Sequence, residues 1–145
     1  MAGPPVTTRR GFSLPELLVT LLIVGIVATC AVVAQQAAAQ RARRAAASAA
    51  LLELALRQER HLARHGRYAS DPGDLGWQRA CGGAIPWPDA ARPWYLLRLR
   101  AAGSAPGGRE YQAVARPAAA QRDDPCGALR IDQLGRRGAE RDDCW

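Results

Sequence analysis

The chain has 145 residues, enough for one modest domain and too few for a second folded domain of ordinary size. Its hydrophobic share of 48% is that of a globular protein, but much of it is alanine and much of the remainder lies near the N-terminus, so we expect a small core. The 20 basic residues are all arginine and outnumber 13 acidic residues, which gives a formal charge of +7 and favours contact with nucleic acid or anionic surfaces. A solvated arginine-rich surface explains the same charge more simply.

The sequence carries no recognisable catalytic motif. It contains no pattern that joins a nucleophile to a base, no glycine-rich phosphate loop and no Cys/His spacing typical of a metal site. His61 and His65 are four residues apart, but no third ligand follows them, so we expect both to face solvent. We therefore expect no enzyme, no catalytic residue, no cofactor and no bound metal.

The first predicted element is an apolar helix near the N-terminus. Residues 17–36 carry no charge, and 20 residues at a rise of about 1.5 Å match the hydrocarbon core of a bilayer, about 30 Å thick. Arg9 and Arg10 precede this segment and no acid precedes Glu16. The positive-inside tendency therefore places the N-terminus in the cytoplasm and the rest of the chain outside.

A cleaved secretory signal peptide is the main alternative for this segment. Residues 37–39 are three alanines, which would supply the small residues that signal peptidase requires. The apolar run is longer than the usual signal-peptide core, and Glu16 stands at its leading edge. Both features favour a membrane-spanning helix.

Glu16 is the informative residue of this helix. A charged side chain that enters hydrocarbon costs about 2.5 to 3.5 kcal/mol on insertion scales, so its presence implies a partner. A capping box is the structural alternative, because Ser13 and Glu16 have the S-x-x-E spacing that satisfies free amides at a helix start. Pro15 agrees with a helix that begins near Phe12 or Ser13.

Residues 9–18, Arg-Arg-Gly-Phe-Ser-Leu-Pro-Glu-Leu-Leu, resemble the class III leader junction of type IV pilins and pseudopilins. The resemblance implies that a prepilin peptidase cuts after Gly11 and methylates the new terminal amine of Phe12. It also implies that Glu16, the fifth residue of the mature chain, pairs with the amino terminus of a neighbouring subunit. Opposite charges in a low dielectric stabilise each other when matched and are costly when one stands alone.

Residues 35–65 lack glycine and proline and are rich in strong helix formers, so we expect the helix to continue outward. At 100° per residue, one broad face is apolar and is expected to cover a core, while the opposite face is charged and meets solvent. The apolar face comprises Ala45, Ala49, Leu51, Leu52, Ala55, Leu56, Leu62 and Ala63. The charged face comprises Glu53, Arg57, Arg60, His61 and Arg64.

A small antiparallel sheet is predicted after the helix. Gly66 ends the helical pattern, and residues 71–88 read as a long irregular loop. Strands are predicted at residues 94–100, 110–116 and 128–133, where apolar and polar residues alternate between turns. A helix laid across such a sheet gives an α+β fold. The tryptophans Trp77, Trp87 and Trp94 are expected to pack the loop onto helix and sheet rather than to stack nucleic-acid bases.

Three cysteines, Cys81, Cys126 and Cys144, follow the apolar segment, so we expect an oxidising compartment. Three candidates leave one thiol over, and counting alone does not fix the pairing. The segment between Cys126 and Cys144 has little apolar content to hold it down. A disulfide that closes a loop of this length contributes about 3 kcal/mol in the chain-entropy model.

Most of the chain from residue 50 onward resembles PilE-like minor pilins, apart from residues 73–93 and 101–109. Residues 50–54, 58–60 and 66–69 match, followed by Tyr111, Pro117, Gln121, Asp123, Cys126, Gly127, Leu129, Ile131, Asp132, Gly135, Cys144 and Trp145. The resemblance implies a type IV pilin fold, with a long N-terminal helix on a small antiparallel sheet and a C-terminal region closed by a Cys126–Cys144 disulfide. Cys81 is then the odd thiol, and a bond from Cys81 to either partner remains open.

By this resemblance we expect four segments along the chain. Residues 1–11 form a prepilin leader peptide, 12–36 a transmembrane and fibre-core helix, 37–66 its amphipathic outer half, and 67–145 a periplasmic or extracellular globular head.

The resemblance implies a structural subunit, a minor pilin of a type IV pilus that supports pilus biogenesis, motility or adhesion. Its expected partners are other pilins in a helical fibre, the prepilin peptidase and the inner-membrane assembly platform. The chain would reside in the inner membrane before assembly and in the extracellular fibre afterwards. A pseudopilin of a type II secretion system is one alternative.

A DNA-binding competence pilin is the other alternative, because many arginines of the head are available for phosphate contacts. The candidate nucleic-acid contacts are Arg98, Arg100, Arg130, Arg136 and Arg137. Four acids near the disulfide are expected to oppose DNA: Asp123, Asp124, Asp142 and Asp143.

Overall fold

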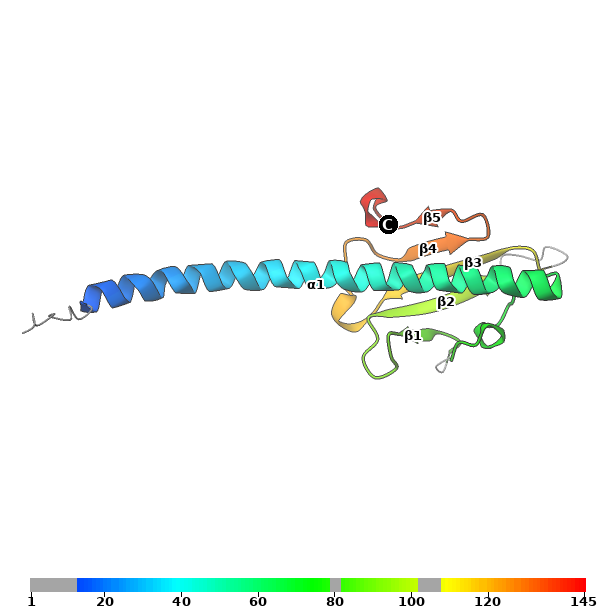
Figure 1. Cartoon of the computed structure of the whole chain (residues 1–145), viewed down its shortest axis with the longest axis horizontal. Helices are drawn as coiled ribbons and strands as arrows, with labels where there is room; N and C mark the ends of the chain where they lie inside the picture. Colours follow the sequence, from blue (N-terminus) through cyan, green and yellow to red (C-terminus); the bar gives the residue numbers. More distant parts are fainter. Residues whose placement is uncertain (1–12, 79–81, 102–107) are drawn as a thin grey trace, which may run out of the picture. The chain divides into compact units, whose positions relative to one another are not determined.

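A computed structural model describes residues 13–78, 82–101 and 108–145 (Figure 1). The chain divides into two compact units, of which the first ends at Ala38 and the second spans Ala39 to Trp145. Helix α1 (Leu14–His65) contributes to both units. Its start agrees with the predicted one, and the carbonyl of Ser13 accepts the amides of Glu16 at 3.1 Å and Leu17 at 3.2 Å.

The first unit consists of the apolar part of α1. The large apolar side chains from Leu14, at 76%, to Val32, at 53%, are more than half exposed in the isolated chain. Within the described residues, α1 is the one helix long and apolar enough to cross a membrane, judged by length and composition. An uninterrupted apolar surface of this kind needs hydrocarbon or other apolar helices around it.

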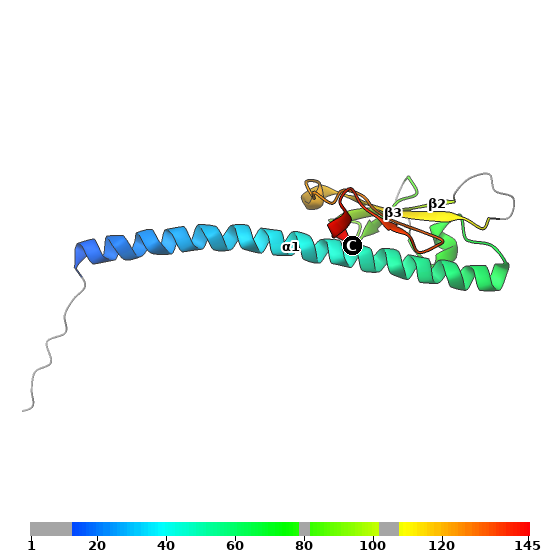
Figure 2. The same cartoon turned by 90° about the horizontal axis from the view of Figure 1, so that it is seen from above.

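The second unit contains a five-stranded antiparallel sheet in the order β1-β2-β3-β4-β5. The strands are β1 (Ile85–Trp87), β2 (Tyr95–Ala101), β3 (Tyr111–Pro117), β4 (Leu129–Asp132) and β5 (Arg137–Gly138). Each strand pairs with its neighbour in sequence, so the sheet is a meander. Figure 2 shows that it lies along one side of the part of α1 that belongs to this unit.

The three predicted strands are confirmed as β2, β3 and β4, each with ends that shift by one residue. The prediction did not include β1 or β5. β1 has three residues, includes Pro86 and lies in a stretch rich in glycine and proline, while β5 has two residues. Neither is long enough to show the alternation that identifies a strand in sequence.

The core lies between α1 and the sheet. From α1 it takes Ala47, Ala50, Leu51 and Leu54, and from the strands Ile85, Tyr95, Leu97, Tyr111, Ala113, Ala115, Leu129 and Ile131. The small alanines of the helix allow it to approach the sheet closely. Trp77, Trp87 and Trp94 pack against this core, as predicted. The α+β fold is therefore confirmed.

The predicted core-facing side of α1 was partly wrong. Leu51 is fully buried, but Leu52 is 41% exposed and Leu56 is 51% exposed. The buried positions are 47, 50, 51, 54 and 58, which follow the helical period more narrowly than the broad face that was predicted. Alanine at position 47 and glutamine at position 58 gave no hydrophobic signal for this stripe.

Gln58 is buried, and its side-chain amide hydrogen-bonds to the backbone of the loop that follows α1. Its Nε2 donates to the carbonyl of Ala69 at 2.9 Å, and its Oε1 accepts the amide of Ala69 at 2.8 Å. The helix itself ends where predicted, since Gly66 adopts the left-handed region with φ of 70° and its amide bonds to the carbonyl of Leu62. The two features direct the chain from the helix back towards the sheet.

Candidate functional site

The start of α1 places Glu16 in the first helical turn, with an exposed side chain. The predicted cleavage and methylation positions, Gly11 and Phe12, lie outside the described residues. Within the described part of the chain, the side chains of Ser13 and Glu16 form no hydrogen bond or ion pair, so the reciprocal bonds of a capping box are not seen. The Glu16 carboxylate is therefore available to a partner outside the described chain.

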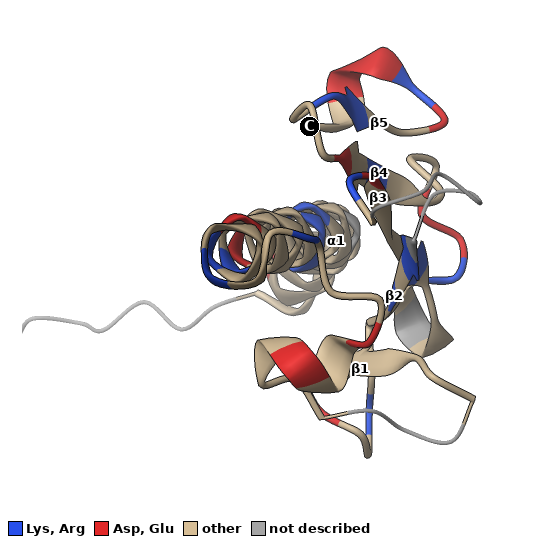
Figure 3. Cartoon of the chain, turned by 90° about the vertical axis from the view of Figure 1, so that its right-hand side faces the viewer, with Lys and Arg blue, Asp and Glu red and all other residues tan. Residues whose placement is uncertain are grey.

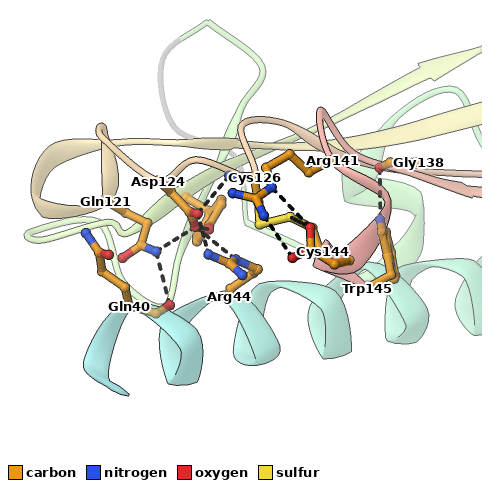
Figure 4. Close-up of a disulfide and its surroundings, with 11 residues drawn as sticks. Gln40, Arg44, Gln121, Asp124, Cys126, Gly138, Arg141, Cys144 and Trp145 are labelled. Atoms are coloured by element: carbon orange, nitrogen blue, oxygen red, sulfur yellow. Dashed lines mark hydrogen bonds and ion pairs between the residues drawn. A yellow bond between two sulfur atoms is a disulfide. The ribbon is translucent and has the colours of Figure 1, made fainter. Parts of the chain in front are cut away.

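A buried ionic network joins α1 to the segment before the disulfide (Figure 4). Asp124 has a fully buried side chain, and Arg44 of α1 binds it at two points, Nη2 to Oδ1 at 2.6 Å and Nε to Oδ2 at 3.2 Å. Tyr95 Oη donates to the same carboxylate at 2.6 Å and Gln121 Nε2 at 2.8 Å. The backbone amide of Cys126 completes the set at 3.0 Å.

This set of donors determines the charge state of the network. Burial by itself raises the pKa of Asp124, but the hydrogen bonds from Arg44, Tyr95, Cys126 and Gln121 outweigh it and lower that pKa to about 2. Burial, followed by the hydrogen bond to Asp124, raises the pKa of Tyr95 above its usual range. Asp124 is therefore ionised and Tyr95 neutral at physiological pH. Gln121 also bonds to the carbonyl of Gln40 at 3.1 Å, a second link to α1.

The predicted Cys126–Cys144 disulfide is confirmed, with Cα atoms 5.6 Å apart. Trp145 follows it and donates from Nε1 to the carbonyl of Gly138 at 2.9 Å, and the guanidinium of Arg137 lies 5.5 Å from the indole centroid. Cys81 lies outside the described residues. Within those residues Cys30 is a free, exposed cysteine.

A groove opens on the face of the sheet that points away from α1, with a volume of about 480 Å³. We call it the arginine groove and define it by its lining residues, Leu96, Arg98, Arg100, Gln112, Val114, Arg116 and Arg130. These residues alternate along β2, β3 and β4 with the buried residues that face the helix. Figure 3 shows basic positions along β2. It also shows that α1 lies on the other side of the sheet.

The structure separates the five candidate nucleic-acid contacts. Arg98, Arg100 and Arg130 line the arginine groove together. Arg136 lies in the β4–β5 turn and pairs with Asp132 at 2.6 Å, while Arg137 stands opposite the buried Ile131 and lines a different depression beside α1.

Arg116 is not among the five candidates, although it is one of the other head arginines considered available for phosphate contacts, and it also lines the groove. The period-2 alternation of β3 places it on the same face as Gln112 and Val114, and the cross-strand register sets it opposite Leu96. The alternation of β3 therefore explains why Arg116 joins the groove.

The expectation that four acids oppose DNA needs correction at Asp124. This carboxylate is buried and neutralised by Arg44, so it projects little charge to the surface. Asp143 lies near the disulfide as expected, and Arg141 pairs with it at 3.1 Å. The arginine groove has no acid among its lining residues.

A long helix with an apolar first part, packed in its second part on an antiparallel sheet that ends in a disulfide-closed segment, defines a type IV pilin. Residues 7–31 match the prokaryotic N-terminal methylation motif. Residues 35–130 match the family described as type IV minor pilin ComP, DNA uptake sequence receptor. This match spans more than half of the chain, which therefore belongs to that family.

A solved structure agrees with this assignment. The chain is similar to a type IV pilin from Shewanella oneidensis, with 26% sequence identity and a TM-score of 0.54, over 73% of this chain and 97% of that one. A search of curated proteins gives no match. The chain is a minor pilin, and its role is that of a structural pilus subunit.

Proposed function

We propose that this minor pilin inserts in the inner membrane with its N-terminus in the cytoplasm, is cut after Gly11 and methylated at Phe12, and joins a helical fibre through the first part of α1. Its partners in this pathway are the prepilin peptidase, the inner-membrane assembly platform and other pilin subunits. The proposal is supported by the methylation-motif match and by an apolar helix whose side chains are exposed in the isolated chain. The match to minor pilins favours a pilus over a type II secretion system.

The observation that carries the proposal is Glu16, an exposed carboxylate without a partner in the described chain, one turn into an apolar helix. Placing this charge in hydrocarbon costs about 2.5 to 3.5 kcal/mol on insertion scales. The terminal amine created by cleavage carries the opposite charge and lies on every mature subunit. Pairing the amine of one subunit with Glu16 of its neighbour removes the cost and fixes the axial register between them.

The processing step is tested by expressing the chain with a matched prepilin peptidase and determining the mature N-terminus by mass spectrometry. We expect a methylated Phe12 as the first residue. A mature chain that begins near Gln40 would show signal-peptide cleavage and would overturn the proposed anchoring.

The assembly step is tested with Glu16→Ala. We expect this variant to be inserted and cleaved as the parent is, but to be depleted from fibres formed together with the other pilins. Glu53→Ala is the matched control, because it removes an exposed glutamate from the same helix outside the apolar part and should enter fibres normally. Equal incorporation of Glu16→Ala and the parent would contradict the proposed pairing.

A second candidate function is DNA reception by the displayed head. It is supported by the description of the matched family, which names a DNA uptake sequence receptor, and by the acid-free arginine groove. Guanidinium groups bind phosphate oxygens through paired hydrogen bonds, and each neutralised phosphate releases counterions. The groove is thus a chemically suitable site for a nucleic-acid strand.

This second function is tested with the mature full-length chain in a non-ionic detergent and a labelled DNA duplex. We expect affinity to fall as salt is added, and Arg98→Gln/Arg130→Gln to weaken binding. The double variant Arg136→Gln/Arg137→Gln removes the same charge outside the groove and should have the smaller effect. Binding that does not respond to salt, or equal losses in both double variants, would remove the groove as the receptor site.

A further inference from the structure

The first arginines after the apolar part of α1 lie at a defined distance along the helix. Residues 17–40 carry no charge, and Arg41 is the first charged residue that follows them. These residues belong to one continuous helix and extend over about 36 Å, whereas the hydrocarbon core of a bilayer is about 30 Å thick and a bilayer with its headgroups about 40 to 45 Å. When the apolar part of α1 spans the membrane, Arg41 therefore reaches the headgroups of the periplasmic leaflet.

Three arginines occupy this level of α1, and two of them have no counter-charge in the described part of the chain. Arg44 is engaged at two points by the buried carboxylate of Asp124 (Figure 4). Arg41 is exposed and Arg43 is half-buried, and neither forms an ion pair or a side-chain hydrogen bond with a described residue. Residues 17–52 contain no acid. Two uncompensated positive charges in this position favour an anion supplied by the surroundings.

An indole of the head holds the side chain of Arg43. The guanidinium of Arg43 lies 5.4 Å from the centroid of the Trp94 ring, and Trp94 is half-buried against the core. Stacking covers the flat face of a guanidinium and leaves the N–H donors at its edge free to bind a phosphate. Tryptophan is enriched where membrane meets water, because its ring is apolar and its N–H is polar. Arg43 and Trp94 thus combine two kinds of side chain that are favoured at the headgroup level.

The head is tied to α1 at the same level, which gives these arginines a fixed setting. Gln121 Nε2 donates to the carbonyl of Gln40 at 3.1 Å, one residue before Arg41. Arg41 and Arg43 are two residues apart and therefore point in directions about 200° apart around the helix. Because lipids surround a membrane-spanning helix on all sides, each arginine meets a headgroup of its own.

We propose that Arg41 and Arg43 bind the phosphate groups of anionic phospholipids in the periplasmic leaflet and hold the base of the head against the inner membrane before assembly. The inference rests on the proposed membrane anchoring and adds the lipid as a partner. A basic residue near an anionic surface strengthens binding about fivefold, so two of them should favour an anionic over a zwitterionic lipid by about 25-fold. A subunit that leaves the bilayer for the fibre gives up both contacts.

Native mass spectrometry tests the inference by counting the lipids bound to the mature full-length chain in a non-ionic detergent. The chain is titrated with phosphatidylglycerol and, separately, with phosphatidylcholine of the same acyl chains. We expect phosphatidylglycerol to bind at least about tenfold more tightly, with a preference that falls as salt is added. Inorganic phosphate at the concentration of the lipid should not displace phosphatidylglycerol, because the acyl chains hold the lipid in the micelle beside the helix.

The variants assign this preference to residues. Arg41→Gln/Arg43→Gln should reduce it to about twofold or less, since neither glutamine carries a charge. Arg60→Gln/Arg64→Gln is the matched control, because it removes the same charge from exposed positions of the same helix, beginning about 28 Å beyond Arg41, and it should retain the preference. Arg41→Gln alone leaves the contact between Arg43 and Trp94 intact and should lose about fivefold.

The outcomes separate the inference from the anchoring on which it rests. Equal binding of both lipids by the parent, or equal losses in the two double variants, would overturn the inference and leave the anchoring standing. Displacement of phosphatidylglycerol by equimolar inorganic phosphate would show that the arginines take free phosphate and would overturn the lipid assignment. Anchoring is checked with phosphatidylcholine vesicles, with which the parent should float after an alkaline wash. A chain that washes off these vesicles would overturn both.

Discussion

Arg44 and Asp124, 80 positions apart in the sequence, form a two-point ion pair that fastens helix α1 to the segment entering the disulfide. The Asp124 side chain is fully buried and that of Arg44 is 17% exposed, so this pair is shielded from water. Hydrogen bonds from Tyr95, Gln121 and the Cys126 amide satisfy the remaining capacity of the carboxylate. The pair thus adds a buried polar contact to the apolar contacts that hold α1 to the rest of the head.

Replacing Arg44 with alanine should destabilise the protein strongly. The substitution leaves the buried carboxylate of Asp124 without its cation, and breaking a buried pair in this way costs about 3 to 5 kcal/mol. Arg136→Ala breaks an exposed pair with Asp132 and should cost about 1 kcal/mol or less. The measurement is the free energy of unfolding in denaturant of the full-length chain in detergent. Equal losses in Arg44→Ala and Arg136→Ala would show that the burial of Asp124 is unimportant.

The stability contributed by Asp124 should depend on acid pH. Although burial favours the protonated form, the hydrogen bonds from Arg44 and its neighbours hold the pKa of Asp124 at about 2, below the ordinary value of 3.8. A depressed folded-state pKa contributes stability that is fully present above the ordinary pKa and is lost as the pH falls through the folded-state pKa. The window for Asp124 is therefore about pH 4 down to about pH 2.

Asp124→Asn provides the measurement, because asparagine does not titrate. The difference in free energy of unfolding between parent and variant should be constant above about pH 5 and should shrink towards pH 2. A difference that stays constant down to pH 2 would show that Asp124 does not titrate with the predicted pKa.

Removing the disulfide should weaken the head by about 3 kcal/mol, because it closes a loop with a sequence separation of 18 residues. The double variant Cys126→Ala/Cys144→Ala tests this by denaturant unfolding under oxidising conditions. Cys30→Ala is the matched control, since Cys30 is a free cysteine in the apolar part of α1 and should not affect the head. A fully stable double variant would mean that the core alone retains the C-terminal segment.

Two neighbouring leucines of α1 should differ sharply when each is changed to alanine. Leu51 is fully buried against the sheet, so Leu51→Ala should cost about 2 to 5 kcal/mol. Leu52 is 41% exposed, and Leu52→Ala should change the stability of the isolated chain by about 0.5 kcal/mol or less. Thermal and denaturant unfolding of the two variants measure both losses. A larger loss of stability in Leu52→Ala than in Leu51→Ala would contradict the observed helix orientation.

The long elements of this fold could be predicted from local pattern. The apolar run before Gln36, the glycine-free stretch up to His65 and the alternation along β2 and β3 each extend over enough residues to show their period. The disulfide partners came from resemblance to known pilins, because cysteine spacing alone left three pairings open.

The missed features depend on contacts between distant parts of the chain. Nothing near Asp124 indicates that an arginine 80 positions earlier neutralises it, and nothing near Gln58 indicates that the backbone of Ala69 is its partner. The arginine groove also required the register of three strands, which sets Arg116 and Arg130 beside Arg98 although the sequence separates them. Strand register is specified by the whole sheet and not by any one strand.

The Cys126–Cys144 bond spans β4, β5 and the turn between them, where Leu134 is 68% exposed. Exposed turns of this kind are preferred sites of proteolytic nicking. A protease that cut the chain at Leu134 would leave the two fragments linked through sulfur, with Trp145 still anchored to its end of the bond. A nicked subunit would run as an intact one on a gel until a reductant released the terminal peptide.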